Sequence, residues 1–448
     1  MTSTQRRKES SPTVDTQTAT LPEPNPREIR NVVLSSFLGT TIEYYDFLLY
    51  TTAATIVFPT VFFSELPDAA ALIVSFLTLA AGYVARPIGG AVFGHFGDVL
   101  GRKKMLVLSL TIMGVASVLI GLLPSTDAIG PAAGIILVSL RFIQGIAIGG
   151  EWGGATLMTA EHARGDRRGF ISSFTNSGAP AGLVLGNLLF ALFALLPEEQ
   201  FLTWGWRVPF VLSAILLVVG LLVRTRVAES PVFLAAAQKP KKDRRAPILE
   251  IIRHPGTVIK VGIGCMANPV ISILPSTIAL SYAVTSGLDR SAVLAVISGV
   301  TFVQIFTIPV FAHLSDRFGR KRIMIGALIA AVAWVIALFP TIATGHLWAV
   351  ALIYLVGVSL IHAALIGPMP SFLSEQFGTG VRYSGISIGY QLSNVVGGFI
   401  PAIITAILAS AAGLPAAVGT LAGIYVVSAL VLATMSERKG ENLSEVRP

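Results

Sequence analysis

The strongest constraint on this chain is a series of long apolar stretches. Crossing the hydrocarbon of a bilayer takes about 17 to 25 residues of helix, and twelve stretches have about that length or more. A helix satisfies its backbone polar groups within the segment, so each stretch predicts a transmembrane helix. The predicted spans are 31–58, 71–96, 105–123, 131–160, 170–196, 208–223, 257–283, 292–314, 323–339, 347–372, 384–409 and 416–435.

The composition supports a membrane protein. Charged residues make up 12% and apolar residues 53% of the chain, whereas ordinary soluble domains carry roughly 25% charged residues. The single cysteine, Cys265, excludes a disulfide framework and a cysteine metal site, and we expect it to pack as a small apolar residue. Residues 1–30 are polar and proline-containing, which predicts a disordered tail without a signal peptide.

A short segment occurs twice and divides the chain into similar halves. GHFGDVLGRKKM at 94–105 is repeated as AHLSDRFGRKRI at 312–323, and Asp98 and Asp316 lie 218 residues apart. Each copy joins the end of one predicted span to the start of the next. The predicted organisation is a disordered cytoplasmic tail 1–30, a six-helix bundle 31–223, a cytoplasmic linker 224–255, a second six-helix bundle 256–435 and a cytoplasmic tail 436–448.

The distribution of basic residues predicts the orientation. Most of the 32 Lys and Arg residues fall in the tails and in the loops after even-numbered spans, so both termini are expected in the cytoplasm. The basic run Lys239, Lys241, Lys242, Arg244 and Arg245 would then lie in the linker. A nucleic-acid patch is the alternative for that run, but a solvated loop beside an anionic leaflet is favoured.

Several chemistries have no counterpart in the sequence. The chain contains no GxxxxGK[ST] phosphate loop, so ATP hydrolysis is not expected and an ion gradient would have to drive uphill transport. No metal-ligand cluster, nucleophile triad or signalling domain is recognisable. We therefore expect a transporter without cofactor or metal rather than a membrane enzyme.

The repeated loop, with its G-x-x-x-D-R-x-G-R-[KR]-like pattern after the second and eighth spans, resembles the major facilitator superfamily. The first copy departs at Val99, where the family usually has Arg. Further stretches resemble its metabolite:proton symporter family, namely YYDFLLY from Tyr44, ARPIGGAVFGHFGD from Ala85, RFIQGIAIGGEWGGA from Arg141, WGWRVPF from Trp204 and RYSGISIGYQ from Arg382. The resemblance implies an all-α fold of two six-helix bundles.

It also implies a function. A relative of these symporters would be a monomer of the plasma membrane that takes up a small polar metabolite, an organic acid or zwitterionic osmolyte, together with protons. Its partners would be the solute, protons and the bilayer, without nucleic acid. The alternative is a proton-coupled exporter, because SGAPAGLVLG from Ser177 partly matches the G-P-x-x-G-G motif of exporters.

The charged residues of the repeated loop predict a cytoplasmic latch. Glycines in the loop permit a tight turn and close helix approach. Asp98 with Arg102, and Asp316 with Arg320, would tie the two halves together in one state and separate in the other. The alternative is that these charges only set the membrane topology.

Charged residues inside the spans are few, and each costs about 2.5 to 3.5 kcal/mol to insert, so each needs a partner or a wet cavity. From the 1.5 Å rise per residue, Asp46 and Arg141 lie at similar depths, as do Arg86 and Glu151. Two acid–base pairs along one cavity are therefore predicted. Asp46 is the leading proton carrier, as the resemblance also implies, with Glu43 and Glu151 behind it.

Uncharged polar residues on several span faces predict the substrate site. They would line a cavity between the halves near the midplane. The candidates are Tyr50, Gln144, Asn176, Asn187, Asn268, His362, Tyr390, Gln391 and Asn394. The seventh span is expected to be broken by Pro269 and Pro275, where a gate could bend. Gly145, Gly149 and Gly153 of the fourth span are expected to permit close helix packing.

Overall fold

The computed structural model of the 448-residue chain describes residues 26–237, 247–253, 255–441 and 443. The predicted disorder of residues 1–25, and the basic run of the linker, lie outside this part of the chain. Every secondary-structure element in the described part of the chain is a helix. The all-α prediction is confirmed.

The long helices follow the predicted spans. In the first half they are α1 Pro26–Ile56, α3 Asp68–Leu100, α4 Arg102–Leu122, α6 Ala132–His162, α7 Arg168–Phe193 and α9 Arg207–Thr225. In the second half they are α12 Gly256–Gly264, α13 Ala267–Ile273 and α14 Ile278–Thr285, then α15 Arg290–Phe318, α16 Arg320–Ala343, α17 Leu347–Tyr354, α18 Ala363–Ile366, α19 Met369–Ser374, α20 Arg382–Ala409 and α21 Gly413–Thr434. Short helices α2 Phe58–Val61, α5 Thr126–Ile129 and α8 Glu198–Gln200 cap one end, and α10 Pro231–Ala237 and α11 Pro247–Arg253 lie at the other.

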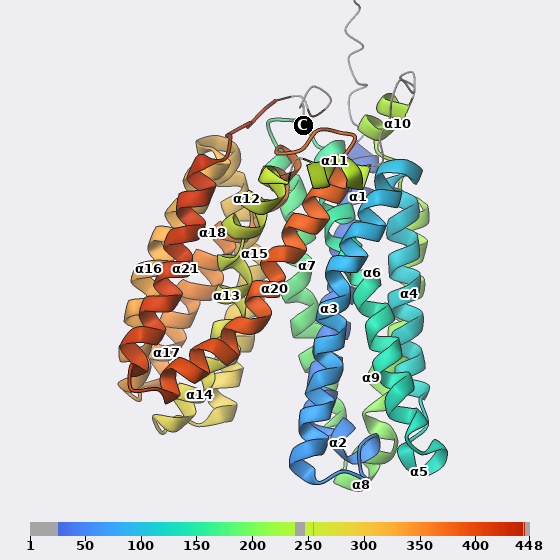
Figure 1. Cartoon of the computed structure of the whole chain (residues 1–448), viewed down its shortest axis with the longest axis vertical. Coiled ribbons are helices and arrows are strands. Elements are labelled where there is room, and N and C mark those ends of the chain that lie inside the picture. The colour runs from blue at the N-terminus through green and yellow to red at the C-terminus, as the bar shows by residue number, and fades with distance from the viewer. Residues whose placement is uncertain (1–25, 238–246, 254, 442, 444–448) are drawn as a thin grey trace, which may run out of the picture.

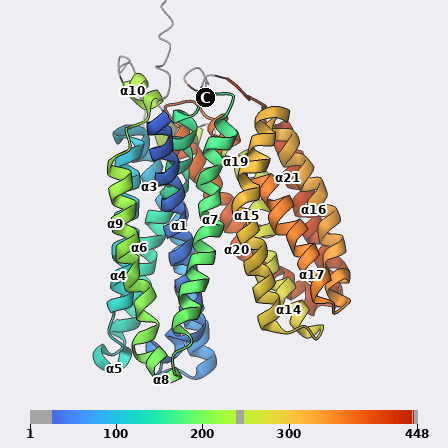
Figure 2. The same ribbon diagram turned by 180° about the vertical axis from the view of Figure 1, so that it is seen from behind.

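Eleven helical segments of the described chain are long and apolar enough to cross a membrane. The remaining predicted span, 31–58, corresponds to α1, which has 31 residues and runs the length of its bundle (Figure 2). Glu43, Asp46 and the charged residues near its start make α1 less apolar than the others. It can still span because its polar residues face neighbouring helices, with both acids buried.

Two predicted domain boundaries differ from the helix ends, one by five residues and one by two. α1 begins at Pro26, so residues 26–30 are helical rather than part of a disordered tail. Proline is well suited to the first position of a helix, and Glu28 in the first turn complements the helix dipole. α9 continues through Arg224 and Thr225 into the predicted linker, because the Arg224 side chain is buried against acidic and carbonyl groups inside the bundle.

The seventh and tenth spans are interrupted helices. The seventh breaks between α12 and α13 and again at the 3₁₀ turn Leu274–Ser276, which contains Pro275. The hydroxyl of Tyr354 donates to the Pro275 carbonyl at 3.3 Å. The tenth span contains a π-helical stretch, Leu355–His362, whose wider turn ends at His362. Prolines therefore break the seventh span as predicted.

The helices form two bundles that meet at one end and diverge at the other (Figure 1). Across the junction, α20 packs against α3 and α6, and α15 packs against α7. The bundles meet at the end where α1 begins and where the last described residues lie, and we call this the closed end (Figures 1 and 2). The division into bundles follows the internal repeat.

Glycines allow the tightest helix contacts, as expected for the fourth span. A Cβ at Gly145 or Gly149 would collide with the backbone of α3, and one at Gly153 would collide with Ser387 of α20. These three glycines thus let α6 approach both its own bundle and the opposite one. The prediction of close packing is confirmed.

Candidate functional site

A buried acid–base cluster lies inside the first bundle. Nη1 of Arg141 is 3.4 Å from Oδ2 of Asp46, and Nε2 of Gln144 donates to the same oxygen at 3.1 Å. The hydroxyl of Ser117 donates to the other Asp46 oxygen, and Gln144 also contacts Ser117 at 2.9 Å. The predicted approach of Asp46 and Arg141 is therefore present, with Ser117 as a partner that the sequence analysis missed.

This cluster is shielded from solvent. Asp46 is 1% exposed and Arg141 is 2% exposed. The ring of Tyr50 covers the Arg141 guanidinium at 4.1 Å, and Gly82 leaves room for the arginine side chain. A charge pair buried this deeply has no water to compensate it, so removing either charge leaves the other uncompensated.

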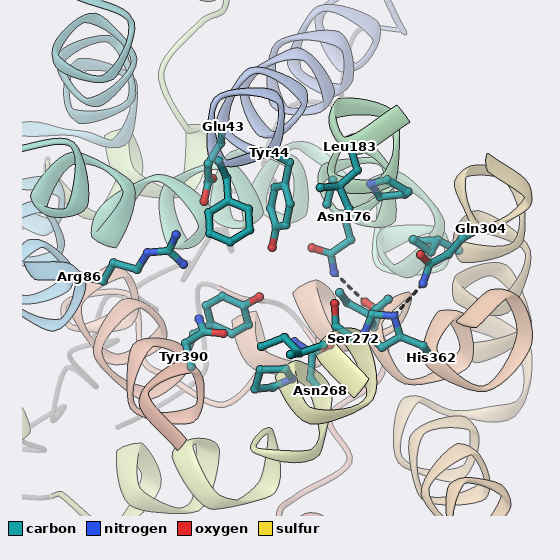
Figure 3. A pocket seen from close by; sticks show the side chains of 18 of the residues that line it. Glu43, Tyr44, Arg86, Asn176, Leu183, Asn268, Ser272, Gln304, His362 and Tyr390 are labelled. Atoms are coloured by element: carbon teal, nitrogen blue, oxygen red, sulfur yellow. Dashed lines mark hydrogen bonds between the residues drawn. The ribbon is translucent and has the colours of Figure 1, made fainter. Parts of the chain in front are cut away.

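A separate polar cavity lies between the bundles (Figure 3). Its volume of about 120 Å³ is several times the roughly 10–15 Å³ that one water requires. Residues from both halves line it: Glu43, Tyr44, Phe47, Tyr83, Arg86, Asn176, Ala179, Pro180, Leu183, Asn268, Pro269, Ser272, Ile273, Gln304, Ile308, His362, Ile366, Tyr390 and Asn394. The cavity can therefore hold a small polar solute.

Five of the nine predicted substrate residues line this cavity, namely Asn176, Asn268, His362, Tyr390 and Asn394. The other four do not. Tyr50 and Gln144 belong to the acid–base cluster, Asn187 is on the exposed side of α7, and Gln391 donates to the Gly149 carbonyl at 3.0 Å across the junction. Their helices were identified correctly, but their side chains face other neighbours.

His362 is held by two amides on the cavity wall of the second bundle. One ring nitrogen, Nδ1, lies 2.7 Å from Nε2 of Gln304, and the other, Nε2, lies 2.9 Å from Oδ1 of Asn268. Since an amide nitrogen donates and an amide oxygen accepts, this arrangement suits a neutral imidazole with its proton on Nε2. His362 is the last residue of the π-helical stretch, and its ring joins α13 and α15 through these two amides. Gln304 had no distinguishing signal in the sequence.

Contacts between the bundles close the cavity on one side. The Trp152 ring of α6 stacks on Tyr390 of α20 with centroids 3.7 Å apart. Trp152 also donates to Asn176 at 2.7 Å, and Asn176 donates to the Ile366 carbonyl at 2.7 Å. Opening the closed end to the cavity requires the Trp152–Tyr390 and Asn176–Ile366 contacts, which join the two bundles, to separate.

The predicted pair of Arg86 with Glu151 does not form. Glu151 instead binds Arg224 of α9 and accepts a hydrogen bond from Ser109 of α4 at 2.5 Å. The helical depths were similar, but Glu151 faces α4 and α9 whereas Arg86 faces the cavity. Gly39 of α1 makes room for the Arg224 guanidinium, because a Cβ there would collide with it.

The latch residues lie at the closed end, where the two aspartates accept hydrogen bonds from the first turns of helices. Asp98 accepts from the backbone N–H groups of Tyr383 at 3.1 Å and Ser384 at 3.0 Å, in the first turn of α20. Asp316 accepts from the N–H groups of Gly169 and Phe170, in the first turn of α7, at 2.9 and 2.8 Å. Each carboxylate thus binds the start of a helix in the opposite bundle, where the helix dipole favours negative charge.

Each latch aspartate also has its arginine, Arg102 or Arg320, four residues later at 3.7 and 3.1 Å. Those arginines lead to two buried clusters. Glu161 lies between Arg102 at 3.5 Å and Arg382 at 3.0 Å. Glu375 lies between Arg320 at 3.2 Å and Arg168 at 2.9 Å. We call these the Glu161 cluster and the Glu375 cluster, and each contains an arginine from both bundles.

The sequence analysis did not assign these glutamates or their cross-bundle arginines. A signal was present, because Glu161 precedes Arg168 by seven residues and Glu375 precedes Arg382 by the same spacing. The two Glu-to-Arg segments are 214 residues apart, close to the period of the repeated loop. A second internal repeat could therefore have located both clusters.

Two helical bundles that share a central polar cavity, with symmetry-related charge clusters closing one end, define a secondary membrane transporter. The chain belongs to the Major Facilitator Superfamily, whose family model matches residues 37–388 and also 261–448. It is a multi-pass protein of the plasma membrane, and its fold and relatives are those of transporters, not enzymes.

Curated relatives cover almost the whole chain. The Shikimate transporter of Escherichia coli (strain K12) is 38% identical over 394 residues, which are 86% of this chain and 89% of that protein. The Inner membrane metabolite transport protein YhjE of the same organism is 39% identical over 91% of this chain and 95% of its own length. The Glycine betaine/proline/ectoine/pipecolic acid transporter OusA of Dickeya dadantii (strain 3937) is 30% identical over 94% of this chain and 86% of its own.

A solved structure has the same fold. The proton:xylose symporter XylE, bound to 6-bromo-6-deoxy-D-glucose, superimposes with a TM-score of 0.76 and covers 94% of this chain and 99% of its own. Its sequence identity is 20%, so this likeness concerns the fold alone.

Proposed function

We propose that this protein takes up a small polar metabolite, an organic acid or a zwitterionic solute, together with protons by alternating access. The observation that carries the proposal is the buried Asp46–Arg141 pair beside, but outside, the cavity between the bundles. A carboxylate whose cationic partner moves away in an apolar setting takes up a proton more readily. Asp46 can therefore link protonation to the movement of helices α1 and α6. One chain lines the whole cavity, so a monomer is sufficient.

We propose that both termini are cytoplasmic, so that the closed end faces the cytoplasm and the structure is outward-facing. The Lys and Arg distribution supports this orientation. Arg226, an exposed residue after α9, offers a test when it is replaced by cysteine. A membrane-impermeant thiol reagent should label Arg226→Cys only after cells are opened, because Cys265 is buried. Labelling in intact cells would reverse the orientation.

In this state, the latch and the Glu161 and Glu375 clusters hold the cytoplasmic side shut while solute enters from outside. Solute binding to side chains of both bundles would favour an occluded state, because only a state with the bundles close together makes both sets of contacts. Protonation of Asp46 would release Arg141 and permit the bundles to rock. The cytoplasmic contacts, including the Trp152–Tyr390 stack, then separate.

Transport in proteoliposomes tests the coupling. With an acidic exterior and a neutral interior, we expect a transported organic acid or betaine to accumulate above its external concentration, and the lumen to acidify with it. A protonophore should remove the accumulation, whereas an imposed sodium gradient should not replace the proton gradient. Accumulation driven by sodium alone, or no movement of protons with solute, would contradict the proposed coupling.

Export remains the second candidate because of the partial SGAPAGLVLG match. In the structure, Gly178 and Gly182 of this segment pack against the backbone of α1, where a Cβ would collide. Such packing is needed for close contact of α1 and α7 whichever way solute moves. Solute extrusion from cells that is driven by inward proton flow would favour the exporter.

A further inference from the structure

The cavity between the bundles contains two ionisable side chains that have no hydrogen-bonded or ion-paired partner among the described residues. Arg86 and Glu43 both line it, and neither forms an ion pair or hydrogen bond with another residue in the part of the chain that the structure describes. Figure 3 shows them on the same side of the cavity, with Ser272 and His362 on the other. An unpaired guanidinium within a membrane span is costly, and it is a candidate for binding a ligand.

The surroundings of Arg86 leave its edge available. Its guanidinium carbon lies 4.4 Å from the centroid of the Tyr83 ring and 5.7 Å from that of Phe47. Aromatic rings hold a guanidinium by its flat face, so its N–H donors still point outward in their fork. That fork matches a carboxylate with two parallel hydrogen bonds. Arg141 cannot serve in the same way, because Asp46 and Tyr50 already occupy it.

Glu43 is placed differently. Its Oε2 is buried without a hydrogen-bond donor among the described residues. A buried carboxylate with an unpartnered oxygen is costly when ionised, and the neutral acid avoids that cost. Among the described residues that line the cavity, Arg86 is the one that carries a permanent positive charge. A zwitterion would require an ionised Glu43 for its ammonium group, whereas an anion would not.

We propose that the cavity binds an organic monocarboxylate that also carries hydroxyl groups. Its carboxylate binds the edge of Arg86, and its hydroxyl groups bind polar side chains of the opposite bundle, Ser272 and Asn394. One unpaired cation selects one negative charge, and neutral hydrogen-bonding groups select hydroxyls. This inference rests on the proposed uptake function and narrows its substrate to one class, in which Arg86 determines specificity.

Binding to the purified protein tests the inference without any transport step. Titration with shikimate, quinate and gluconate, three hydroxylated monocarboxylates, is followed by tryptophan fluorescence, since Trp152 stacks on the cavity residue Tyr390. Methyl shikimate, glycine betaine and glucose serve as neutral or zwitterionic comparisons. We expect at least one of the three acids to bind, and the ester, the betaine and the sugar to bind at least about tenfold more weakly.

Variants then assign the contact. Arg86→Gln should weaken binding of the acid by about 10- to 150-fold, the loss expected for a hydrogen bond to a charged group. Arg86→Lys keeps the charge but loses the fork, so we expect an intermediate affinity. Arg290→Gln, which removes an exposed positive charge at the start of α15, should leave binding unchanged. If Arg86→Gln does not fold, the affinity of Arg86→Lys and the comparison of acid with ester show whether Arg86 binds the carboxylate.

The proposal is overturned if none of the three acids binds, if acid and ester bind equally, or if Arg86→Gln binds normally. Different results would reject the proposed function of proton-coupled uptake. An acid that binds through Arg86 but is not accumulated by a proton gradient would retain the site and reject symport. Proton-driven accumulation of glycine betaine, with no acid bound, would retain symport and reject the monocarboxylate.

Discussion

Replacing Asp46 by asparagine is expected to abolish accumulation of solute, so that its internal concentration only equals the external one. Asparagine has nearly the same shape and can still accept a hydrogen bond from Gln144 or Ser117 at this position. It cannot bind and release a proton, so the proton gradient has no means of driving the cycle. Exchange of labelled for unlabelled solute should continue, because it requires no net proton movement. Counterflow and gradient-driven uptake in proteoliposomes measure the two activities.

The unpaired Arg141 of this variant needs its own control, because a buried charge without a partner can destabilise the fold. The double variant Asp46→Asn, Arg141→Gln removes both charges, and we expect it also to lack accumulation. Asp127→Asn, an exposed acid in α5, should accumulate solute normally. If Asp46→Asn still concentrates solute and acidifies the lumen, the proton is carried elsewhere.

The second large effect is expected for Asp98→Asn at the closed end. The asparagine amide has one acceptor oxygen, so it can satisfy only one of the two N–H groups at the start of α20. The negative charge that interacted with Arg102 and with the helix dipole is also lost. A hydrogen bond to a charged group contributes about 1.5 to 3 kcal/mol, so the closed population should fall by about 10- to 150-fold relative to the open one. Asp316→Asn should act in the same direction at α7.

Spin labels across the closed end measure this change. Cysteines replacing the exposed residues Arg164, after α6, and Gly380, before α20, report the separation of the bundles. We expect a longer-distance population in Asp98→Asn. Asp166→Asn is the matched control. It removes an exposed carboxylate whose ion-pair partner, Arg164, is already replaced by the label, so it should leave the distances unchanged. Identical distance distributions in parent and Asp98→Asn would show that the latch aspartate does not hold the ends together.

Much of this architecture could be predicted from local rules. Span length, the repeated loop and the basic residues depend on short stretches of chain, and the helices begin and end within a few residues of the predicted limits. Asp46 and Arg141 could be matched because depth along a helix follows from residue count. The exceptions are the start of α1, where Pro26 and Glu28 favour an earlier helix start, and the end of α9, which continues past the predicted limit because Arg224 is buried.

Depth alone did not identify partners. Arg86 and Glu151 lie at similar depths, yet one faces the cavity and the other faces α9. For the same reason, Tyr50 and Gln144 were predicted to line the cavity but instead contact Arg141 and Asp46. Helical periodicity says which residues share a face, but not which neighbour that face meets.

The sequence by itself therefore determined the class of protein, the number and position of the spans, and the residues able to carry charge within them. The tertiary structure decided that Arg86 forms no ion pair with any described residue, that His362 joins Gln304 and Asn268, and that Glu161 and Glu375 bridge the bundles. The physical reason is that the rotation of each helix about its axis is set by side-chain packing against several others. Glycine contacts, such as that of Gly39 with Arg224, fix these rotations through atoms far apart in the chain.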